Sequence, residues 1–227
     1  AIKWLDGKTV AVPKGSCTDR FARATFKKYN INPKEYLNQN IELITSGFRA
    51  GKLDAAVIWE PTASRLVTEK LARRVATGND VGENDGAFLT IRQDLIQARP
   101  DIVQKWLEAE LEAEQYLADP KNAREVVRMA KEQTNGFDEK TLWAALFGTY
   151  PKDQGGAAHR LSLPFGFTPT SLELITRATA FLHEVKSISV AELPPQAVLP
   201  ELTAAILKEK GLTPPLGEIK AGGDYTP

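Results

Sequence analysis

The chain has 227 residues, of which 42% are hydrophobic and 26% are charged, enough to bury a substantial core in one or two domains. Its 29 basic and 29 acidic residues cancel to a net charge of zero, so composition gives no electrostatic case for a nucleic-acid partner. No run approaches the roughly 18 consecutive apolar residues of a membrane span, and no charged-then-apolar leader opens the chain.

The first predicted elements are a strand at residues 9–12, a turn and a helix that runs to about residue 29. The strand signal is a short β-rich apolar run bounded by Gly7 and Pro13, as expected for a strand covered on both faces. Ser16 has Asp19 three residues on, the spacing of a capping box at a helix start. The sequence therefore predicts a strand, turn and capped helix.

The start of this helix has the capacity to hold an anion. Its first backbone N–H groups have no partner within the helix, and the hydroxyls of Ser16 and Thr18 add donors, so a carboxylate, sulfonate or phosphate can dock there. The simpler alternative is a turn whose cap satisfies only its own backbone. No glycine-rich nucleotide-binding pattern follows the strand.

Strand and helix signals then alternate up to residue 92. They comprise a strand at 41–45, a short helix before Gly51, a strand at 54–59, a helix starting at Pro61, a weak strand at 73–77 and an apolar run at 87–91. The polar segment at 82–86, before that last run, is predicted to be an ordinary turn or to reach a ligand cleft. Strands that alternate with helices predict a mostly parallel α/β sheet.

Beyond residue 92 the pattern becomes helical. Pro100 opens a predicted helix in which Val103, Leu107 and Leu111 share one face. Further helices are predicted at 122–131, 138–147, 171–185 and 199–210, and the tail from residue 213 is predicted to be irregular. The loop at 149–169 contains His159 and Arg160 and is either functional or a connector.

The single cysteine, Cys17, excludes an internal disulfide and a multi-cysteine metal cluster. Its place at a helix start is one that can lower a thiol pKa and favour nucleophilic chemistry. However, the two histidines, His159 and His183, lie far away in the sequence without a local ligand spacing. The residues therefore favour neither a catalytic thiol nor a metal site.

Four segments together carry a resemblance to a known family: LDGKTVAVPKGS at 5–16, GKLDAAVIWEP at 51–61, GAFLTIRQDLIQARPDIVQKWLEAELEA at 86–113 and SLELITRATAFLHEV at 171–185. In this order, over most of the chain, they resemble the periplasmic solute-binding proteins of ABC importers. More narrowly, they are similar to the nitrate, taurine and aliphatic-sulfonate branch, which includes thiamine-precursor binders.

The resemblance implies a type II periplasmic-binding-protein fold with two α/β lobes. Residues 1–92 would form the second lobe, and residues 93–227 a helical return segment of the first lobe, whose N-terminal strands are absent. In the family, on the order of 90 residues, a usual lobe size, precede this strand–turn–helix. Amphipathic helices without their sheet would expose a large apolar patch. The sequence favours a fragment or split product, with the missing part a separate N-terminal fragment or second chain; the alternative is that the helices repack on each other.

The resemblance also implies ligand-binding residues. Ser16, Cys17 and Thr18 would face the cleft between the lobes, as would Trp59 and Glu60 after the strand at 54–59. Ligands of open α/β sheets tend to bind at such carboxyl ends. Trp59 would supply an apolar or cation–π wall and Glu60 a partner for an ammonium group. The alternative for Glu60 is a carboxylate that only favours the dipole of the helix after it.

The implied function is the capture of a small polar or anionic solute, such as a sulfonate, taurine, nitrate or thiamine precursor. The protein would present this solute to an ABC permease in the periplasm or another extracytoplasmic space, with its signal peptide already removed and with no cofactor, metal, nucleic-acid partner or enzyme activity. The alternative is an enzyme of the same fold in thiamine or menaquinone biosynthesis. This chain lacks the cysteine-rich motif that such a thiamine-precursor synthase would carry.

Overall fold

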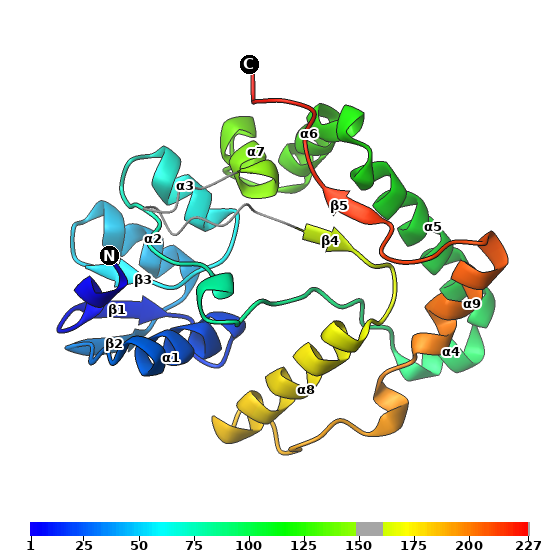
Figure 1. Ribbon diagram of the computed structural model, residues 1–227, viewed down its shortest axis with the longest axis horizontal. Coiled ribbons are helices and arrows are strands. Elements are labelled where there is room, and N and C mark those ends of the chain that lie inside the picture. The colour runs from blue at the N-terminus through cyan, green and yellow to red at the C-terminus, as the bar shows by residue number, and fades with distance from the viewer. Residues whose placement is uncertain (149–160, 227) are drawn as a thin grey trace.

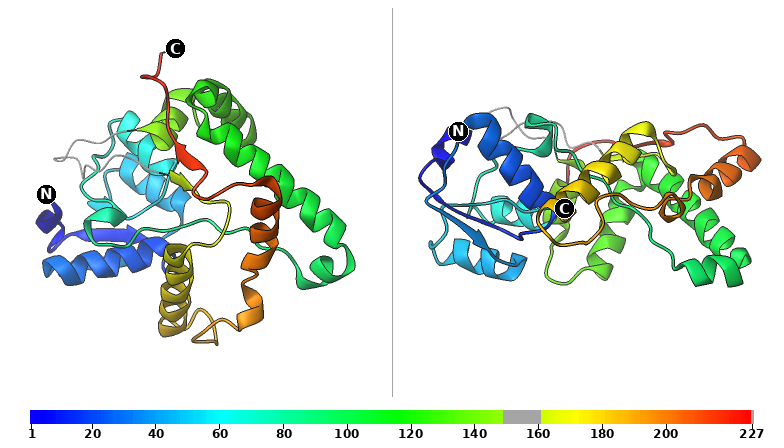
Figure 2. Two further views of the ribbon diagram at one scale, coloured as in Figure 1. Left: turned by 45° about the vertical axis from the view of Figure 1, so that its right-hand side comes forward. Right: turned by 90° about the horizontal axis from the view of Figure 1, so that it is seen from below.

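The structure is a computed structural model that describes residues 1–148 and 161–226. The elements follow an open arc, with a small sheet and its helices at one end and the longest helices at the other (Figure 1). A second view shows helix α8 reaching across to the end that holds the sheet (Figure 2). The fold is therefore mixed α/β, as the sequence predicts.

The sheet has three parallel strands in the order β2-β1-β3. Its strands are β1 (Thr9–Val12), β2 (Glu35–Asn38) and β3 (Ala55–Ala56). In the central strand, Val10 lies opposite Tyr36 on one side and Ala55 on the other. Val10, Ala11 and Val12 are completely buried, which confirms the prediction of a strand covered on both faces.

Three helices connect and cover these strands: α1 (Cys17–Tyr29), α2 (Ile41–Arg49) and α3 (Thr62–Thr68). The chain passes from β1 through α1 to β2, and then through α2 to β3 on the opposite side of β1 (Figure 1). The strand order therefore reverses between β1 and β3. Such a reversal opens a crevice at the carboxyl ends of the two strands, where ligands of open α/β sheets bind.

The predicted strand at 41–45 is wrong, because these residues form the first half of α2. The side chain of Asn40 accepts a hydrogen bond from the Leu43 backbone N–H at 2.9 Å and thereby caps the helix. Ile44 and Thr45 are buried on its inner face. The paired strand is instead the more polar β2, which lies six residues earlier.

The weak strand at 73–77 and the returning strand at 87–91 were also predicted wrongly. Neither segment forms a helix or joins a sheet. Phe88 stacks on Phe167 with a centroid separation of 6.3 Å, yet Phe88 and Leu89 remain exposed. An apolar run becomes a strand only where a neighbouring strand offers hydrogen-bond partners, and the described chain brings none to these segments.

The predicted helical segments of the second half are all confirmed, with ends shifted by a residue or two. The helices are α4 (Gln93–Ala98), α5 (Pro100–Ala118), α6 (Ala123–Gln133), α7 (Glu139–Phe147), α8 (Pro169–Glu184) and α9 (Pro200–Lys210). Short 3-10 turns lie at Ile2–Leu5, Gly78–Asp80, Pro120–Asn122 and Pro195–Ala197. Residues 149–160 of the predicted loop, with His159 and Arg160, lie outside the described residues.

The C-terminal tail is not irregular throughout, as predicted, because part of it pairs as a strand. β5 (Gly217–Ile219) is antiparallel to β4 (Leu161–Leu163). At the other end of the tail, Arg124 of α6 hydrogen-bonds to the carbonyl oxygen of Thr226 at 2.9 Å. The pairing partner of β5 lies more than 50 residues earlier in the sequence, so the local composition of the tail does not reveal it.

Two separate cores hold the arc together. One lies under the sheet and includes Leu5, Val10 and Ile31. The other lies between α5 and α9 and is built from Val103, Leu107, Leu111, Phe165, Ile206 and Leu207. Between them, α3 packs on α7 through the hydroxyls of Thr68 and Thr141, which are 3.0 Å apart.

The molecule has an unusually large surface for its mass. It exposes 14000 Å² of solvent-accessible surface, whereas a compact monomer of 24.9 kDa exposes about 10,000 Å². Large apolar side chains contribute to this surface, including Leu95, Trp106 and Leu172. No helix in the described ranges is long and apolar enough to cross a membrane.

Candidate functional site

The structure brings both predicted groups of site residues to one edge of the sheet. Ser16, Cys17 and Thr18 follow β1, and Trp59 and Glu60 follow β3. β1 and β3 are parallel neighbours, and the Val57 N–H extends their pairing by donating to the Ala11 carbonyl at 3.0 Å. The two groups therefore flank the point where the strand order reverses.

The turn after β1 does not form the predicted capping box. Ser16 is the N-cap residue of α1, but its side chain makes no capping bond. Its hydroxyl donates to the Pro13 carbonyl at 2.5 Å and lies 2.7 Å from the Thr18 hydroxyl. Because the Ser16 hydrogen is used there, Thr18 is the donor of that pair. An anion would instead meet the backbone N–H groups of the first turn, which have no partner within the helix.

Asp19 locks this turn in place. Its carboxylate is 1% exposed and accepts hydrogen bonds from the Gly15 N–H at 2.9 Å, the Arg23 guanidinium at 2.8 Å and the Tyr36 hydroxyl at 2.6 Å. Burial alone raises the pKa of Asp19, but these three donors outweigh it and hold the pKa below its usual value. Asp19 thus ties the turn to α1 and to β2.

Cys17 is not an activated thiol, contrary to the effect of a helix start considered from the sequence. Burial and, after it, the hydrogen bond and negative charge of Asp85 together raise the pKa of Cys17 to about 11, against the smaller opposing effects of the Thr18 backbone and Arg20. The thiol is therefore protonated at neutral pH. A nucleophilic mechanism through Cys17 finds no support in this geometry.

The segment at 82–86 forms one wall beside the start of α1. Arg20 is only 8% exposed; its guanidinium contacts Glu83 at 2.9 Å and Asp85 at 3.6 Å, and it donates to the Asn84 carbonyl at 3.4 Å. This segment therefore lies beside the start of α1, and its reach into a ligand cleft stays a prediction. Sequence reasoning missed Arg20, whose position one turn into α1 was its only signal.

Helix α8 closes the same region from the other side (Figure 2). Its Arg177 donates to the Gly82 carbonyl at 3.2 Å and lies 3.8 Å from Glu83. The chain just after α8 passes so close to Gly15 that a Cβ there would stand 3.0 Å from the Ser187 hydroxyl. Residues separated by more than 150 positions in the sequence therefore border one site.

Trp59 and Glu60 differ in how free they are to meet a ligand. The Trp59 side chain is 42% exposed. Both oxygens of Glu60 are engaged: one pairs with Arg74 at 2.5 Å and the other accepts from the Ser64 N–H at 2.9 Å. Glu60 thus stabilises the start of α3, as in the alternative interpretation, while Trp59 offers an apolar face.

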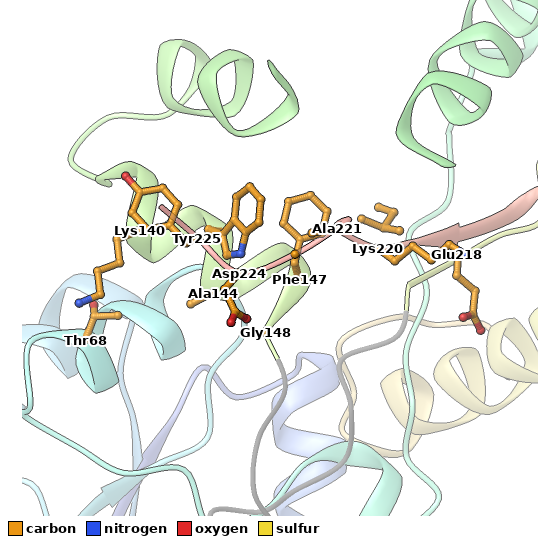
Figure 3. A pocket seen from close by; sticks show the side chains of 13 residues that line it. Thr68, Lys140, Ala144, Phe147, Gly148, Glu218, Lys220, Ala221, Asp224 and Tyr225 are labelled. Carbon is orange, nitrogen blue, oxygen red and sulfur yellow. The ribbon is translucent and has the colours of Figure 1, made fainter. Parts of the chain in front are cut away.

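A separate cavity of about 630 Å³ lies between α3, α7 and the C-terminal segment (Figure 3). Trp143 forms its aromatic wall, with centroid separations of 4.9 Å to Phe147 and 5.7 Å to Tyr225. The side chains of Lys140, Glu218, Lys220 and Asp224 surround it, so its charges balance. None of the five predicted site residues lines it. In the described ranges, no three metal-ligating side chains gather closely enough to hold a metal ion.

A protein-family model matches this chain and identifies its family. The family model described as the NMT1-like family matches residues 3–131, more than half of the chain. The chain belongs to the NMT1-like family. This match includes the sheet, both groups of predicted site residues and α5. No curated protein matches this NMT1-like chain by sequence.

Solved structures with the same fold come from ABC import systems. A putative sulfonate ABC transporter periplasmic sulfonate-binding protein from Methylobacillus flagellatus KT has a TM-score of 0.65 and 16% identity, covering 99% of this chain and 66% of its own. The ligand-binding component of an ABC-type import system from Staphylococcus aureus, solved with zinc bound, has a TM-score of 0.63 and 14% identity. The match covers 88% of this chain and 63% of the solved one. The alkanesulfonate-binding protein from Xanthomonas axonopodis pv. citri, bound to MOPS, has a TM-score of 0.57 and 20% identity. The match covers 89% of this chain and 64% of the solved one.

These likenesses show that this NMT1-like chain has the periplasmic-binding-protein fold. The chain spans less than two thirds of the length of the three structures. Their identities of 14% to 20% establish the fold and leave the ligand open. The function must therefore be argued from the site of this chain.

Proposed function

We propose that this chain is part of a solute-binding protein that delivers a small polar or anionic solute to an ABC importer. The observation that carries the proposal is that residues 16–18 and Trp59 and Glu60 follow neighbouring parallel strands, beside the point where the strand order reverses. Residues 1–92 would be one lobe, and residues 93–227 would belong to its partner lobe. The protein would act in the periplasm or another extracytoplasmic space.

The chemistry of the site favours a small zwitterion over a dianion. The first turn of α1 offers backbone N–H groups to an anionic head. Asp85, which is 43% exposed, places a carboxylate beside the same edge and suits an ammonium end. An aminosulfonate such as taurine has both groups, whereas sulfate would meet this carboxylate unfavourably. Nitrate and thiamine precursors remain within the proposed class.

Tight capture requires a second wall that closes on the ligand. The solved structures of the same fold are longer than this chain by about a third of their length, which leaves room for that wall. We include in the proposal a further polypeptide segment, separate or attached, that completes the cleft. The ligand would then stabilise the closed arrangement through contacts with both sides.

Calorimetric titration with three related solutes tests this function. Taurine carries both charges, ethanesulfonate has no ammonium group, and sulfate is a dianion. The expected order of affinity is taurine, then ethanesulfonate, then sulfate. Binding at the proposed site should also change the fluorescence of Trp59, and a Trp59→Phe variant identifies that part of the signal. Tightest binding of sulfate, or equal affinity for taurine and ethanesulfonate, would contradict the proposed ligand chemistry.

A further inference from the structure

Two carboxylates and two guanidiniums meet beside the start of α1, at the segment 82–86. Arg20 of α1 is 8% exposed and contacts Glu83 at 2.9 Å and Asp85 at 3.6 Å. Arg177 comes from α8, the helix that reaches across to this end of the molecule (Figure 2), and lies 3.8 Å from the other oxygen of Glu83. Charged groups therefore join α1, the segment at 82–86 and α8.

The two carboxylates of this cluster are not equivalent. Glu83 is 17% exposed and accepts a hydrogen bond from the Arg20 Nε at 2.9 Å. Asp85 is 43% exposed, and its separation of 3.6 Å from Arg20 is longer than a hydrogen bond. The Asp85 carboxylate instead accepts a hydrogen bond from the Cys17 thiol, which is protonated at neutral pH. The charge of Arg20 is therefore compensated mainly by Glu83, and the charge of Asp85 is left largely uncompensated.

We propose that Glu83 is a positioning residue of the solute site: it holds the charge of Arg20 and so leaves the Asp85 carboxylate for the ammonium end of the solute. This inference rests on the proposed function, in which Asp85 meets that ammonium group. Both oxygens of Glu83 are engaged, one by Arg20 and the other by Arg177. Glu83 therefore acts through Asp85 rather than by contact with the solute.

The burial of Arg20 explains why Asp85 depends on Glu83. A guanidinium that is taken out of water needs a carboxylate at contact distance, because an unpaired buried charge is strongly unfavourable. If Glu83 loses its charge, Asp85 is a carboxylate that already lies 3.6 Å from Arg20. Arg20 would then turn to Asp85 and neutralise it, and the solute site would lose its preference for an ammonium group.

Arg177 holds Glu83 in this arrangement from the side of α8. It donates a hydrogen bond to the Gly82 carbonyl at 3.2 Å, next to the Glu83 backbone. The Glu83 N–H donates in turn to the Gly78 carbonyl at 2.8 Å. The segment at 82–86 forms no helix or strand, so contacts of this kind, and not secondary structure, place the Glu83 carboxylate beside α1.

Calorimetric titration of Glu83→Gln with taurine and ethanesulfonate tests this role. Glutamine has the shape of glutamate and keeps an acceptor oxygen, so the variant removes the charge alone. The ratio of taurine affinity to ethanesulfonate affinity should fall by about tenfold, whereas a merely loosened turn would weaken both solutes alike. Glu173→Gln is the matched control and should keep the wild-type ratio, because Glu173 contacts Arg177 at 4.0 Å but is 70% exposed on α8.

The alkylation rate of Cys17 tests the same role without any solute. When Arg20 pairs with Asp85, the thiolate of Cys17 meets less negative charge. Glu83→Gln should therefore react with iodoacetamide about threefold faster than wild type near pH 8, equivalent to half a pKa unit. In an Asp85→Asn background the same substitution should have a clearly smaller effect, because the charge that Arg20 would neutralise is already gone. Circular dichroism confirms that each variant remains folded.

The two measurements separate the possible failures. Equal wild-type affinity for taurine and ethanesulfonate would contradict the ligand chemistry of the proposed function and leave the alkylation result standing. If the 227-residue chain binds neither solute, the alkylation rate alone decides whether Glu83 controls the charge of Asp85. An unchanged affinity ratio in Glu83→Gln, an unchanged alkylation rate, or an equal acceleration in the Asp85→Asn background would overturn the role of Glu83.

Discussion

Alkylation of Cys17 gives a direct test of the electrostatics at the candidate site. The pKa of Cys17 rises from 9.0 to about 11, chiefly through burial and then through Asp85. Only the thiolate reacts with iodoacetamide, so near pH 8 the folded chain should react ~100-fold more slowly than an unperturbed thiol. The chain has a single cysteine, so the gain in intact mass reports this one site.

The same chain unfolded in urea provides the reference rate. The rate should be followed from pH 7 to pH 11 in both states. Asp85→Asn removes the negative charge that raises the pKa, so its pH profile should shift toward lower pH, while burial keeps it above that of the unfolded chain. Equal rates in the folded and unfolded chain, or an unchanged profile in Asp85→Asn, would refute this reasoning.

The raised pKa also predicts a direction for stability. The unfolded chain releases the Cys17 proton near pH 9.0, whereas the folded chain holds it to about 11. Between these values the unfolded state binds fewer protons, so the contribution of Cys17 to stability declines as the pH rises. Urea unfolding of wild type and Cys17→Ser at pH 8 and pH 11 measures this, and a wild type that gains stability relative to the variant at pH 11 contradicts the sign.

Three further perturbations test the turn, the core and the site edge. Asp19→Asn leaves one of the three donors facing an amide NH2, which should cost about 2–4 kcal/mol in urea unfolding. Because the pKa of Asp19 is lowered, its contribution to the free energy of unfolding is fully present above about pH 4 and is lost as the pH falls further. If the stability of Asp19→Asn fell as steeply in acid as that of the wild type, this assignment would be wrong. Ile44→Ala removes a completely buried side chain and should cost about 2–5 kcal/mol, and a cost below 1 kcal/mol would argue against the packing of α2. Asp85→Asn should weaken taurine binding by about tenfold but leave ethanesulfonate binding unchanged, whereas equal affinity for taurine would remove Asp85 from the site.

Local periodicity in the sequence was sufficient to predict many elements. The buried strand β1 and the helices from α5 to α9 follow from apolar spacing and from proline at helix starts. The alternation of strands and helices also predicted a parallel sheet, which the structure confirms. The positions of residues 16–18, Trp59 and Glu60 at one edge follow in turn from parallel strands, because their carboxyl ends meet at the same side.

Tertiary structure alone decided which segments pair and which side chains meet. Residues 41–45 have a strand composition, but Asn40 caps them as a helix, and the polar segment of β2 became the strand because β1 was available beside it. The pKa of Cys17 depends on Asp85, which lies 68 residues later in the sequence, so position at a helix start gave the wrong direction. On α5, the exposed Ile102, Trp106 and Tyr116 follow a helical spacing just as the buried residues of the same helix do, and only packing distinguishes the two sets. Hydrophobic spacing identifies the faces of an element, whereas burial, charge pairing and strand pairing depend on which distant residues the fold brings to those faces.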